Sequence, residues 1–244
     1  MKTAIIIPAR YASSRFPGKP LAKIVGKELI LWVHSIAKKV VGNKHVYVAT
    51  ESEKIFKFLK KQNINCFMTS KKCMTGTDRV AEVAKKINYK IFINLQGDEP
   101  LVSPKDILKI IDLKRKKYNE VICGYTKLNN FENPKNKNIP KVLFNEKKKL
   151  IYMSRNILPA SKKKMDVKKM QFYKQVCIYA FNKIELNKFS KYNKKGYSEK
   201  FEDIELLRFF ELDIPIRMLK TRKSSLAVDI KSDIKLIERY LKKN

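Results

Sequence analysis

The sequence predicts an α/β fold with a Rossmann-like, mostly parallel sheet that is flanked by helices. Short apolar runs alternate with longer stretches of helical periodicity along the first half of the chain. Strands that are separated in this way by helices pair in parallel through right-handed crossovers. The 244 residues, of which 44% are hydrophobic, suffice for one such domain with a sizeable core. The chain shows no internal repeat and no linker that would separate a second independent domain.

The predicted strands share short runs of β-branched and aromatic residues: 3–8, 45–50, 65–68, 91–95, 120–126, 176–181 and 216–219. The predicted helices share apolar positions at helical spacing: 28–41, 52–62, 78–87, 104–117, 183–190, 202–212 and 232–242. Thr77 is expected to cap the helix at 78–87, because its hydroxyl can accept a hydrogen bond from a free backbone N–H. The segment 129–145, with its Pro and Asn residues, predicts a loop that leads into a strand at 142–144, and the Lys- and Met-rich segment 160–171 predicts a flexible stretch.

The net charge of +32 raises the question of a nucleic-acid partner. Lys greatly outnumbers Arg and is spread along the whole chain, with only short clusters. No helix-turn-helix, zinc-finger or aromatic RNA-binding signature accompanies the charge. A solvated, lysine-rich surface is therefore the favoured interpretation, with weak and salt-sensitive binding of polyanions but no specific nucleic-acid partner.

The cysteine and histidine content limits the chemistry that the chain can use. The four cysteines lack C-x-x-C spacing and are expected to be small core residues: Cys66, Cys73, Cys123 and Cys177. With only His34 and His45 as imidazoles, a zinc site and a histidine-based triad are disfavoured, which leaves carboxylates, cations and a hard metal ion. No apolar run reaches the ~18 residues of a membrane span, and no cleavable signal segment precedes the first strand. We expect a cytoplasmic protein with no membrane partner.

A loop with three fixed cations directly follows the first predicted strand. Arg10, Arg15 and Lys19 lie in this loop among two Pro and one Gly. The carboxyl end of a strand in an open α/β sheet is where ligands bind, and three cations suit a polyanion, most simply a triphosphate. Neither G-x-x-x-x-G-K-[ST] nor G-x-G-x-x-G is present. An arbitrary basic loop is more often a turn with solvated cations, but its place after the first core strand favours phosphate binding here.

Two acidic residues follow apolar stretches at other points of the chain. Asp98 comes after the strand at 91–95, where Gly97 allows close backbone approach and Pro100 turns the chain outward. Asp229 follows the apolar stretch 226–228 and precedes the last predicted helix. An Asp at a strand end is most often a turn residue or a helix cap, but it can also hold Mg²⁺, which prefers oxygen ligands. Sequence spacing alone does not pair the two residues.

The segment 7–21, I-P-A-R-Y-A-S-S-R-F-P-G-K-P-L, resembles the opening of the 3-deoxy-manno-octulosonate cytidylyltransferase family. Other segments match the same family in the same order: G-T-D-R at 76–79, N-L-Q-G-D-E-P at 94–100, M-S-R at 153–155, I-Y at 178–179 and V-D at 228–229. The resemblance spans nearly the whole chain. The first and third of these segments are together specific, and the later ones are weaker.

The resemblance implies a nucleotidyl transfer for lipopolysaccharide biosynthesis. The anomeric hydroxyl of an eight-carbon sugar acid, 3-deoxy-D-manno-octulosonate (Kdo), attacks the α-phosphorus of CTP, and CMP-Kdo and pyrophosphate are formed. The implied fold is of nucleotidyltransferase type, with a smaller lobe inserted in the C-terminal half. One domain would cover 1–244, with 1–125 binding the nucleotide and 126–244 binding the sugar acid and forming a homodimer. Positioning and charge neutralisation would supply most of the lowering of the barrier.

The resemblance also implies the roles of single residues. Asp98 and Asp229 would share one Mg²⁺ and would form the catalytic set with Lys19. The nucleotide-binding residues would be Arg10, Arg15, Lys19, Gly76 and Arg79. The sugar-acid ligands would be Arg79, Gln96, Arg155, Gln175, Tyr179, Glu202 and Glu205.

A series of carboxylates, Glu199, Glu202 and Glu205, is spaced at intervals of three. This spacing predicts a row along one side of a helical turn. The row could accept hydrogen bonds from the hydroxyl groups of a sugar, or it could be a solvated helix N-terminus.

The chain departs from the family at Gln175, where the family usually has His, and at Ile230 and Lys231, which replace Thr-Pro after Asp229. A neutral amide cannot carry the charge that a His carries, so the identity of the sugar acid is left open. One alternative acceptor is an amino-substituted Kdo or another ulosonic acid. An alternative of a different class is a non-catalytic nucleotide- or nucleic-acid-binding protein, which the positive charge would suit.

Overall fold

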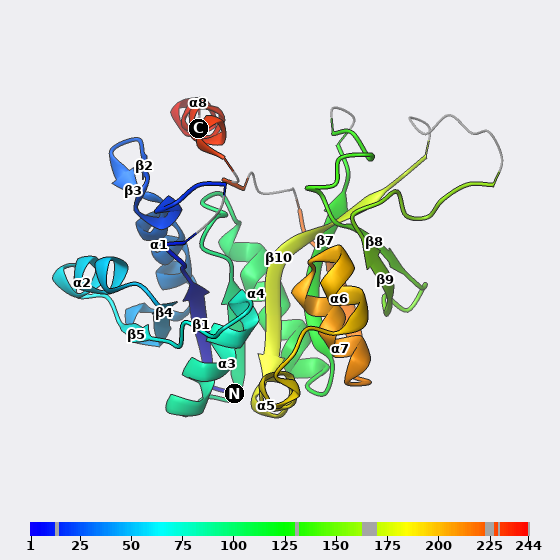
Figure 1. The fold of residues 1–244 in the computed structure, drawn as a ribbon, viewed down its shortest axis with the longest axis horizontal. Coiled ribbons are helices and arrows are strands. Elements are labelled where there is room, and N and C mark those ends of the chain that lie inside the picture. Colours follow the sequence, from blue (N-terminus) through cyan, green and yellow to red (C-terminus); the bar gives the residue numbers. More distant parts are fainter. Residues whose placement is uncertain (13–14, 130–131, 163–169, 223–226, 229, 244) are drawn as a thin grey trace.

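A central sheet with helices on both faces forms the body of the protein (Figure 1). The computed structural model describes residues 1–12, 15–129, 132–162, 170–222, 227–228 and 230–243. The main strands follow one another across the sheet in this order: β11 (Ile216–Lys220), β7 (Val121–Lys127), β10 (Tyr173–Asn182), β6 (Ile91–Leu95), β1 (Thr3–Pro8), β4 (Val46–Thr50) and β5 (Cys66–Met68). Within this order only β10 runs antiparallel to its neighbours, so the predicted mostly parallel sheet is confirmed.

Strand β10 also carries a smaller lobe. Its outer part pairs through Lys174 with β8 (Lys141–Phe144), which in turn pairs with β9 (Leu150–Ser154). Figure 1 shows β8 and β9 set apart from the main layers, beside the outer part of β10. The implied lobe in the C-terminal half is therefore present. The strand β9 was not predicted, although four of its five residues are apolar or aromatic; the Lys run directly before it obscured the signal.

The sheet buries both faces, as the alternation of side chains along β1 shows. Ala4 and Ile6 join one apolar cluster, and Ile5 and Ile7 join another on the opposite face. The first face is covered by α3 (Gly76–Lys86), α5 (Lys183–Tyr192) and α7 (Arg208–Glu211), and the second by α1 (Leu29–Val41), α2 (Glu53–Lys61) and α4 (Pro104–Lys116). Side chains fully buried on both faces explain why β1 reads as a continuous apolar run.

A third, smaller cluster joins the loop after β1 to the end of the chain. It contains Phe16 of that loop, Leu29 at the start of α1, Val228, and Ile237 of α8 (Lys231–Lys243). The short hairpin of β2 (Lys23–Ile24) and β3 (Lys27–Glu28) lies beneath α8 (Figure 1). This cluster brings the C-terminal segment to the carboxyl end of β1.

Two local predictions were wrong. Thr75, not Thr77, caps α3: its hydroxyl accepts from the backbone N–H of Asp78, whose carboxylate accepts from Thr75 in return. The helix predicted at 202–212 is broken into α6 (Tyr197–Glu202), a 3₁₀ turn at Glu205–Leu207, and α7. The break occurs because Asp203 adopts a left-handed conformation with φ of 48°, which ends α6. The flexible stretch predicted at 160–171 lies largely outside the described residues.

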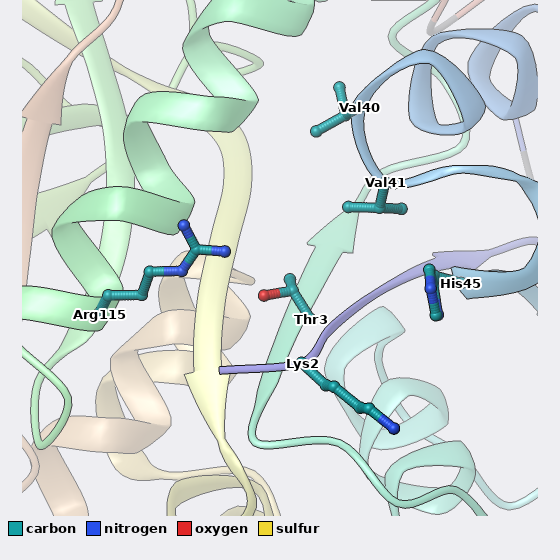
Figure 2. Close-up of a pocket in the computed structure, with 6 residues that line it drawn as sticks. All are labelled: Lys2, Thr3, Val40, Val41, His45 and Arg115. Carbon is teal, nitrogen blue, oxygen red and sulfur yellow. The ribbon is translucent and has the colours of Figure 1, made fainter.

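A pocket of about 220 Å³ lies at the amino end of β1, far along the strand from the cationic loop (Figure 2). It is lined by Lys2, Thr3, Val40, Val41, His45 and Arg115. Its place at the amino edge of the sheet separates it from the ligand-binding edge that the sequence predicts. Among the helices that the structure describes, none combines the length and the apolar character needed to cross a bilayer.

Candidate active site

The carboxyl ends of β1 and β6 approach each other closely at two glycines. A Cβ atom on Gly97 would lie 3.0 Å from the carbonyl oxygen of Pro8, the last residue of β1. A Cβ atom on Gly76, at the start of α3, would lie 2.9 Å from Nε2 of Gln96. A side chain at Gly97 would press against backbone, and one at Gly76 would displace the amide of Gln96, so these glycines let the loops after β1 and β6 and the start of α3 meet.

Lys19 and Asp98, which the sequence predicted as catalytic residues, form an ion pair at this edge. Nζ of Lys19 lies 2.7 Å from Oδ2 of Asp98 and donates to the carbonyl oxygen of Val228 at 2.8 Å. The backbone N–H of Val228 donates to the carbonyl oxygen of Asp98 at 2.9 Å. Asp229 itself lies outside the described residues. Its neighbour Val228 is bonded to the backbone of Asp98.

The two oxygens around Lys19 suit a divalent metal. Oδ2 of Asp98 and the carbonyl oxygen of Val228 already converge on one positive charge, the ammonium of Lys19. Carboxylate and carbonyl oxygens are ligands that hard cations such as Mg²⁺ prefer. Among the described residues, no three His, Cys, Asp or Glu side chains gather into a metal cluster. Phosphate oxygens, water or residues outside that set would have to complete the coordination.

The other two cations of the loop lie toward the lobe. Arg10 is exposed, and Nη1 of Arg15 donates to Oδ1 of Asn138 at 3.3 Å. A hydrogen bond from Lys195 holds the pKa of Asp203 below its ordinary value, and the charges of Arg155 and Arg10 add to this effect. The loop after β1 therefore approaches the C-terminal half of the chain with positive charge.

Arg79 is nearly buried and is bonded to protein groups. Its Nη2 lies 2.8 Å from Oε2 of Glu51, and its Nη1 donates to Oγ1 of Thr69 at 2.8 Å and to the carbonyl oxygen of Ser70 at 3.1 Å. Oε1 of Glu51 accepts from the backbone N–H of Tyr11 at 3.0 Å. Arg79 thus ties together the loops that follow β1, β4 and β5. Its predicted direct contact with nucleotide or sugar stays a prediction.

Gln96 and the start of α3 share one carboxylate. Nε2 of Gln96 donates to Oε1 of Glu205 at 3.0 Å, and the backbone N–H of Thr77 donates to Oε2 at 2.8 Å. Burial raises the pKa of Glu205, and the hydrogen bond from Thr77 opposes that rise. Glu205 therefore fixes the amide of Gln96 at the carboxyl end of β6.

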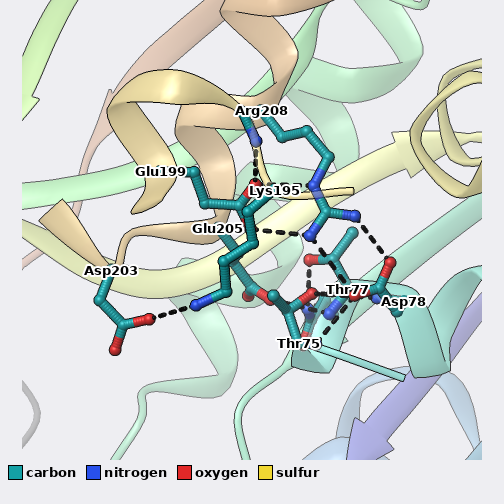
Figure 3. A network of polar contacts seen from close by, with 10 residues as sticks. Thr75, Thr77, Asp78, Lys195, Glu199, Asp203, Glu205 and Arg208 are labelled. Atoms are coloured by element: carbon teal, nitrogen blue, oxygen red, sulfur yellow. Dashed lines mark hydrogen bonds and ion pairs between the residues drawn. The ribbon is translucent and has the colours of Figure 1, made fainter. Parts of the chain in front are cut away.

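A buried network around Arg208 holds the start of α3 (Figure 3). Nε and Nη2 of Arg208 donate to the two carboxylate oxygens of Glu199 at 2.8 and 2.7 Å, and Nη1 donates to Oδ1 of Asp78 at 2.8 Å. Oδ2 of Asp78 accepts from the backbone and hydroxyl of Thr75 at 2.8 and 2.9 Å. Sequence reasoning missed the role of Arg208; the available signal was a charged residue among apolar neighbours in L-L-R-F-F.

Glu202 and Arg155 join α6 to the end of β9. The carboxylate of Glu202 accepts from the hydroxyl of Ser154 and from the backbone N–H of Arg155, both at 2.7 Å. The guanidinium of Arg155 donates to the carbonyl oxygens of Glu202, Lys137 and Asp203. These contacts fix the lobe against the main body, and direct contacts of Glu202 and Arg155 with a sugar acid stay predictions.

The predicted row of three carboxylates is wrong. Glu199 binds Arg208, Glu202 binds the end of β9, and Glu205 binds Gln96 and Thr77. Asp203, which is left-handed, separates Glu205 from the other two carboxylates; Glu199 and Glu202 share α6 but contact different elements, Arg208 of α7 and the end of β9. Neither the helical row nor its alternative, a solvated helix N-terminus, describes them.

Gln175 and Tyr179 meet on β10. Nε2 of Gln175 donates to Oη of Tyr179 at 2.8 Å, where the register of β10 against β7 shifts between Val176 and Tyr179. Tyr179 is buried, and this burial raises the pKa of its hydroxyl. The backbone N–H of Cys177 donates to Oε1 of Glu99 at 3.2 Å, which links β10 to the residue after Asp98. The two predicted sugar-acid ligands on β10 thus adjoin the Asp98 loop.

The family model for cytidylyltransferases matches residues 4–216. The chain belongs to this family. It is 35% identical, over 100% of its length and 98% of the relative, to the 3-deoxy-manno-octulosonate cytidylyltransferase of Fusobacterium nucleatum. It is 33% identical, over 99% of both chains, to the 8-amino-3,8-dideoxy-manno-octulosonate cytidylyltransferase of Shewanella oneidensis.

A solved structure of CMP:2-keto-3-deoxy-manno-octonic acid synthetase complexed with CTP has the same fold. It matches with a TM-score of 0.90 and 31% identity, over 100% of this chain and 99% of the other. The resemblance drawn from the motifs and the nucleotidyltransferase type of the fold are both confirmed. The four cysteines are free; Cys66 and Cys123 are buried core residues as predicted, whereas Cys73 and Cys177 are only partly buried.

Proposed function

We propose that this cytidylyltransferase transfers CMP from CTP to Kdo and releases pyrophosphate, which would supply CMP-Kdo for lipopolysaccharide biosynthesis. The observation that carries the proposal is the cation site formed by Asp98 and Val228 at the carboxyl ends of β1 and β6. Ligands of open α/β sheets bind at this edge. The end-to-end similarity to Kdo cytidylyltransferases gives the substrates that such a site would take.

Asp98, with Asp229, would hold Mg²⁺, which when bound would offset the negative charge of the phosphates. Lys19, Arg15 and Arg10 would bind the phosphate oxygens with charge-assisted hydrogen bonds. These residues lie on one loop, which the apolar contacts of Phe16 hold against Val228. The protein would therefore act mainly by positioning the triphosphate and neutralising its charge.

The sugar acid would lie between the Asp98 loop and β10. Gln96, which Glu205 orients, and Gln175 with Tyr179 present polar groups on this side of the sheet. Amide and phenol groups can donate to and accept from a row of hydroxyls. Arg79 and Arg155 would act by holding the surrounding loops through the contacts described above.

A second candidate acceptor is an 8-amino derivative of Kdo. The Gln175 amide stands where the family usually has His, and it is bonded to Tyr179 in the predicted sugar pocket. The relative that is named for the amino-substituted acid is 33% identical to this chain, close to the 35% identity of the Kdo enzyme of Fusobacterium nucleatum. The preference for one acceptor over the other is a difference between two transition-state affinities, so kcat/KM must be measured with both acids.

The proposal is tested by incubating the purified chain and Mg²⁺ with CTP, UTP or ATP and with Kdo or 8-amino-Kdo. We expect pyrophosphate release with CTP and one of the acids only, and a product with the mass of the CMP-sugar. CTP binding without pyrophosphate release with either acid would support the non-catalytic nucleotide-binding alternative. Tight, salt-resistant binding of RNA or DNA without CTP binding would support a nucleic-acid-binding protein instead.

We also propose a cytoplasmic homodimer. The cytoplasmic location is proposed because CTP is supplied there. The dimer is proposed because aromatic side chains on α6 are exposed and could form an interface. Tyr197 and Phe201 are each 75% exposed with ring centroids 5.1 Å apart, and Phe210 of α7 is 41% exposed. Apolar groups gathered on a surface mark interaction sites. Light scattering of the wild-type chain should give the mass of a dimer, and Phe201→Asp should give that of a monomer; a monomeric wild type would contradict the proposal.

A further inference from the structure

The ammonium of Lys19 occupies the position that suits a metal. It is 2.7 Å from Oδ2 of Asp98 and 2.8 Å from the carbonyl oxygen of Val228. These are the oxygens that the nucleotide-bound chain would offer to a divalent cation under the proposed function. A residue proposed to bind the triphosphate is thus engaged at the metal position instead.

We propose that Lys19 is an exchangeable internal cation. It fills the metal position at Asp98 in the nucleotide-free chain, and it moves to the phosphates of the nucleotide when a divalent cation takes its place. The inference rests on the proposed function for the identity of the nucleotide. Its test uses the metal alone, so the exchange and the proposed function can fail separately.

The ammonium and a divalent cation cannot share this position. Both would be in contact with the same carboxylate oxygen, and two cations at such a separation repel strongly. Metal binding therefore requires the ammonium of Lys19 to leave. In the absence of a nucleotide the ammonium would move into water, and Lys19 would lose both of its oxygen contacts without gaining a new partner.

Lys19 is able to move. Its side chain is 17% exposed and that of Asp98 is 29% exposed, so the pair lies at the surface of the site and not within the core. A lysine ammonium is a point charge on a flexible stem, unlike the planar fork of an arginine. The side chain can therefore rotate without a change in the core.

The oxygens that Lys19 would leave are fixed by other contacts. The backbone N–H of Val228 donates to the carbonyl oxygen of Asp98 at 2.9 Å. The side chain of Val228 is fully buried and packs with Phe16, Leu29 and Ile237. The cradle formed by Asp98 and Val228 therefore persists when the ammonium departs, ready for a second cation.

The exchange couples the two ligands. A triphosphate accepts the ammonium of Lys19 and so frees Asp98, which strengthens metal binding. By linkage, a bound metal strengthens nucleotide binding by the same factor. Metal alone should bind weakly, because Lys19 competes with it.

The test measures Mn²⁺ binding, without nucleotide or sugar, by titration calorimetry and by the loss of the free Mn²⁺ electron paramagnetic resonance signal. Lys19→Met removes the competing charge and should tighten Mn²⁺ binding about tenfold or more relative to the wild type. Lys19→Arg keeps a cation and should remain within about twofold of the wild type. Lys23→Met, at an exposed lysine nearby, removes the same charge from the chain and is the matched control; it should also remain within about twofold.

Unchanged or weaker Mn²⁺ binding by Lys19→Met, with the control variants as expected, would overturn the proposal and make Lys19 a fixed clamp. Thermal unfolding checks that each variant is folded, and Lys19→Gln replaces Lys19→Met if the latter is not. Adding Asp98→Asn to Lys19→Met should abolish the tightened binding; its persistence would place the metal elsewhere. Tighter binding by Lys19→Met together with a wild type that releases no pyrophosphate would support the exchange and contradict the proposed function.

Discussion

The Lys19–Asp98 pair and the Arg208 network are both ion pairs, but they differ in their access to solvent. The side chains of Lys19 and Asp98 are 17% and 29% exposed, while those of Arg208 and Glu199 are 0% and 1% exposed. Lys19 makes two contacts to oxygens, whereas three nitrogens of Arg208 are paired with two carboxylates. The Lys19–Asp98 pair is therefore open to ligands, whereas the Arg208 network is closed to solvent.

The difference in burial distinguishes an ion pair that can interact with ligands from one that stabilises the fold. A solvent-exposed ion pair contributes about 0–1 kcal/mol, and the partly exposed Lys19–Asp98 pair is closer to that limit than the Arg208 network is. Removing one partner of a buried pair costs about 3–5 kcal/mol, because the remaining charge stays buried without compensation. Arg208 therefore holds Asp78 and the start of α3, where Thr77 meets Glu205, while Lys19 is left to interact with ligands.

The largest effect is expected at Arg208. Arg208→Leu leaves Glu199 buried without its cation and takes the cation from the nearly buried Asp78, and it should lower the free energy of unfolding by about 3–5 kcal/mol. Urea denaturation measures this loss. Arg115→Leu is the matched control, because Arg115 pairs with Asp112 at 3.0 Å on the surface, and it should change the stability by less than about 1 kcal/mol. Equal losses in both variants would contradict the assignment of Arg208 as structural support.

A smaller effect, on binding and not on stability, is expected at Lys19. Lys19→Met removes one charge-assisted contact to the triphosphate and should cost roughly 1.5–3 kcal/mol, about 10- to 150-fold in CTP affinity. Calorimetric titration of CTP in saturating Mg²⁺ measures it, with Lys23→Met as the control. Unchanged CTP affinity in Lys19→Met would place the triphosphate elsewhere.

Glu205 combines features of the two regions, since it is half-buried and lies beside the predicted sugar pocket, but it also holds the start of α3 through Thr77. Burial raises its pKa above the ordinary value of 4.5, so above the raised pKa the folded chain must keep a buried charge. This cost is absent below pH 4.5, where the carboxyl is protonated in both the folded and unfolded states, and it grows as pH rises through the folded pKa. Glu205→Gln should therefore gain more stability relative to the wild type at about pH 8 than at about pH 4. Urea denaturation at both pH values checks this, and an equal difference at the two would contradict it.

The smallest effect is expected at Gln175, where only the choice of acceptor should change. If the pocket is tuned to Kdo, Gln175→His should be neutral or mildly favourable with that acid. If it is tuned to another acid, the wild type should use Kdo poorly and the variant should shift toward it. The measurement is the ratio of kcat/KM for Kdo and 8-amino-Kdo in both proteins. Identical ratios would show that this position does not read the sugar.

The sequence predicted the parts of the molecule that follow from local patterns. The apolar run of β1, the helical spacing of α1 and the carboxylate after β6 placed Lys19 and Asp98 at one edge of the sheet. The family resemblance then added the lobe and the candidate ligands on β10. These features depend on short segments whose sequence is sufficient to indicate them.

Other features depend on contacts between distant residues and could not be predicted. The pairing of Arg208 with Asp78 spans 130 positions along the chain. The carboxylate row was wrong in part because a left-handed residue, Asp203, separates Glu205 from α6, and Asp is only one of several residues that tolerate this conformation. The structural role of Arg79 was missed because its partner Glu51 lies on a separate loop.

The most direct test of the central claim is the rate of pyrophosphate release from CTP and Kdo by Asp98→Asn at limiting Mg²⁺. The substitution removes one charge from the cation site and leaves the backbone bond to Val228 in place. The account predicts a loss of about 100-fold or more in rate, with a thermal midpoint close to that of the wild type. Near wild-type activity of Asp98→Asn under these conditions would show that the cation site at Asp98 is not where the reaction takes place.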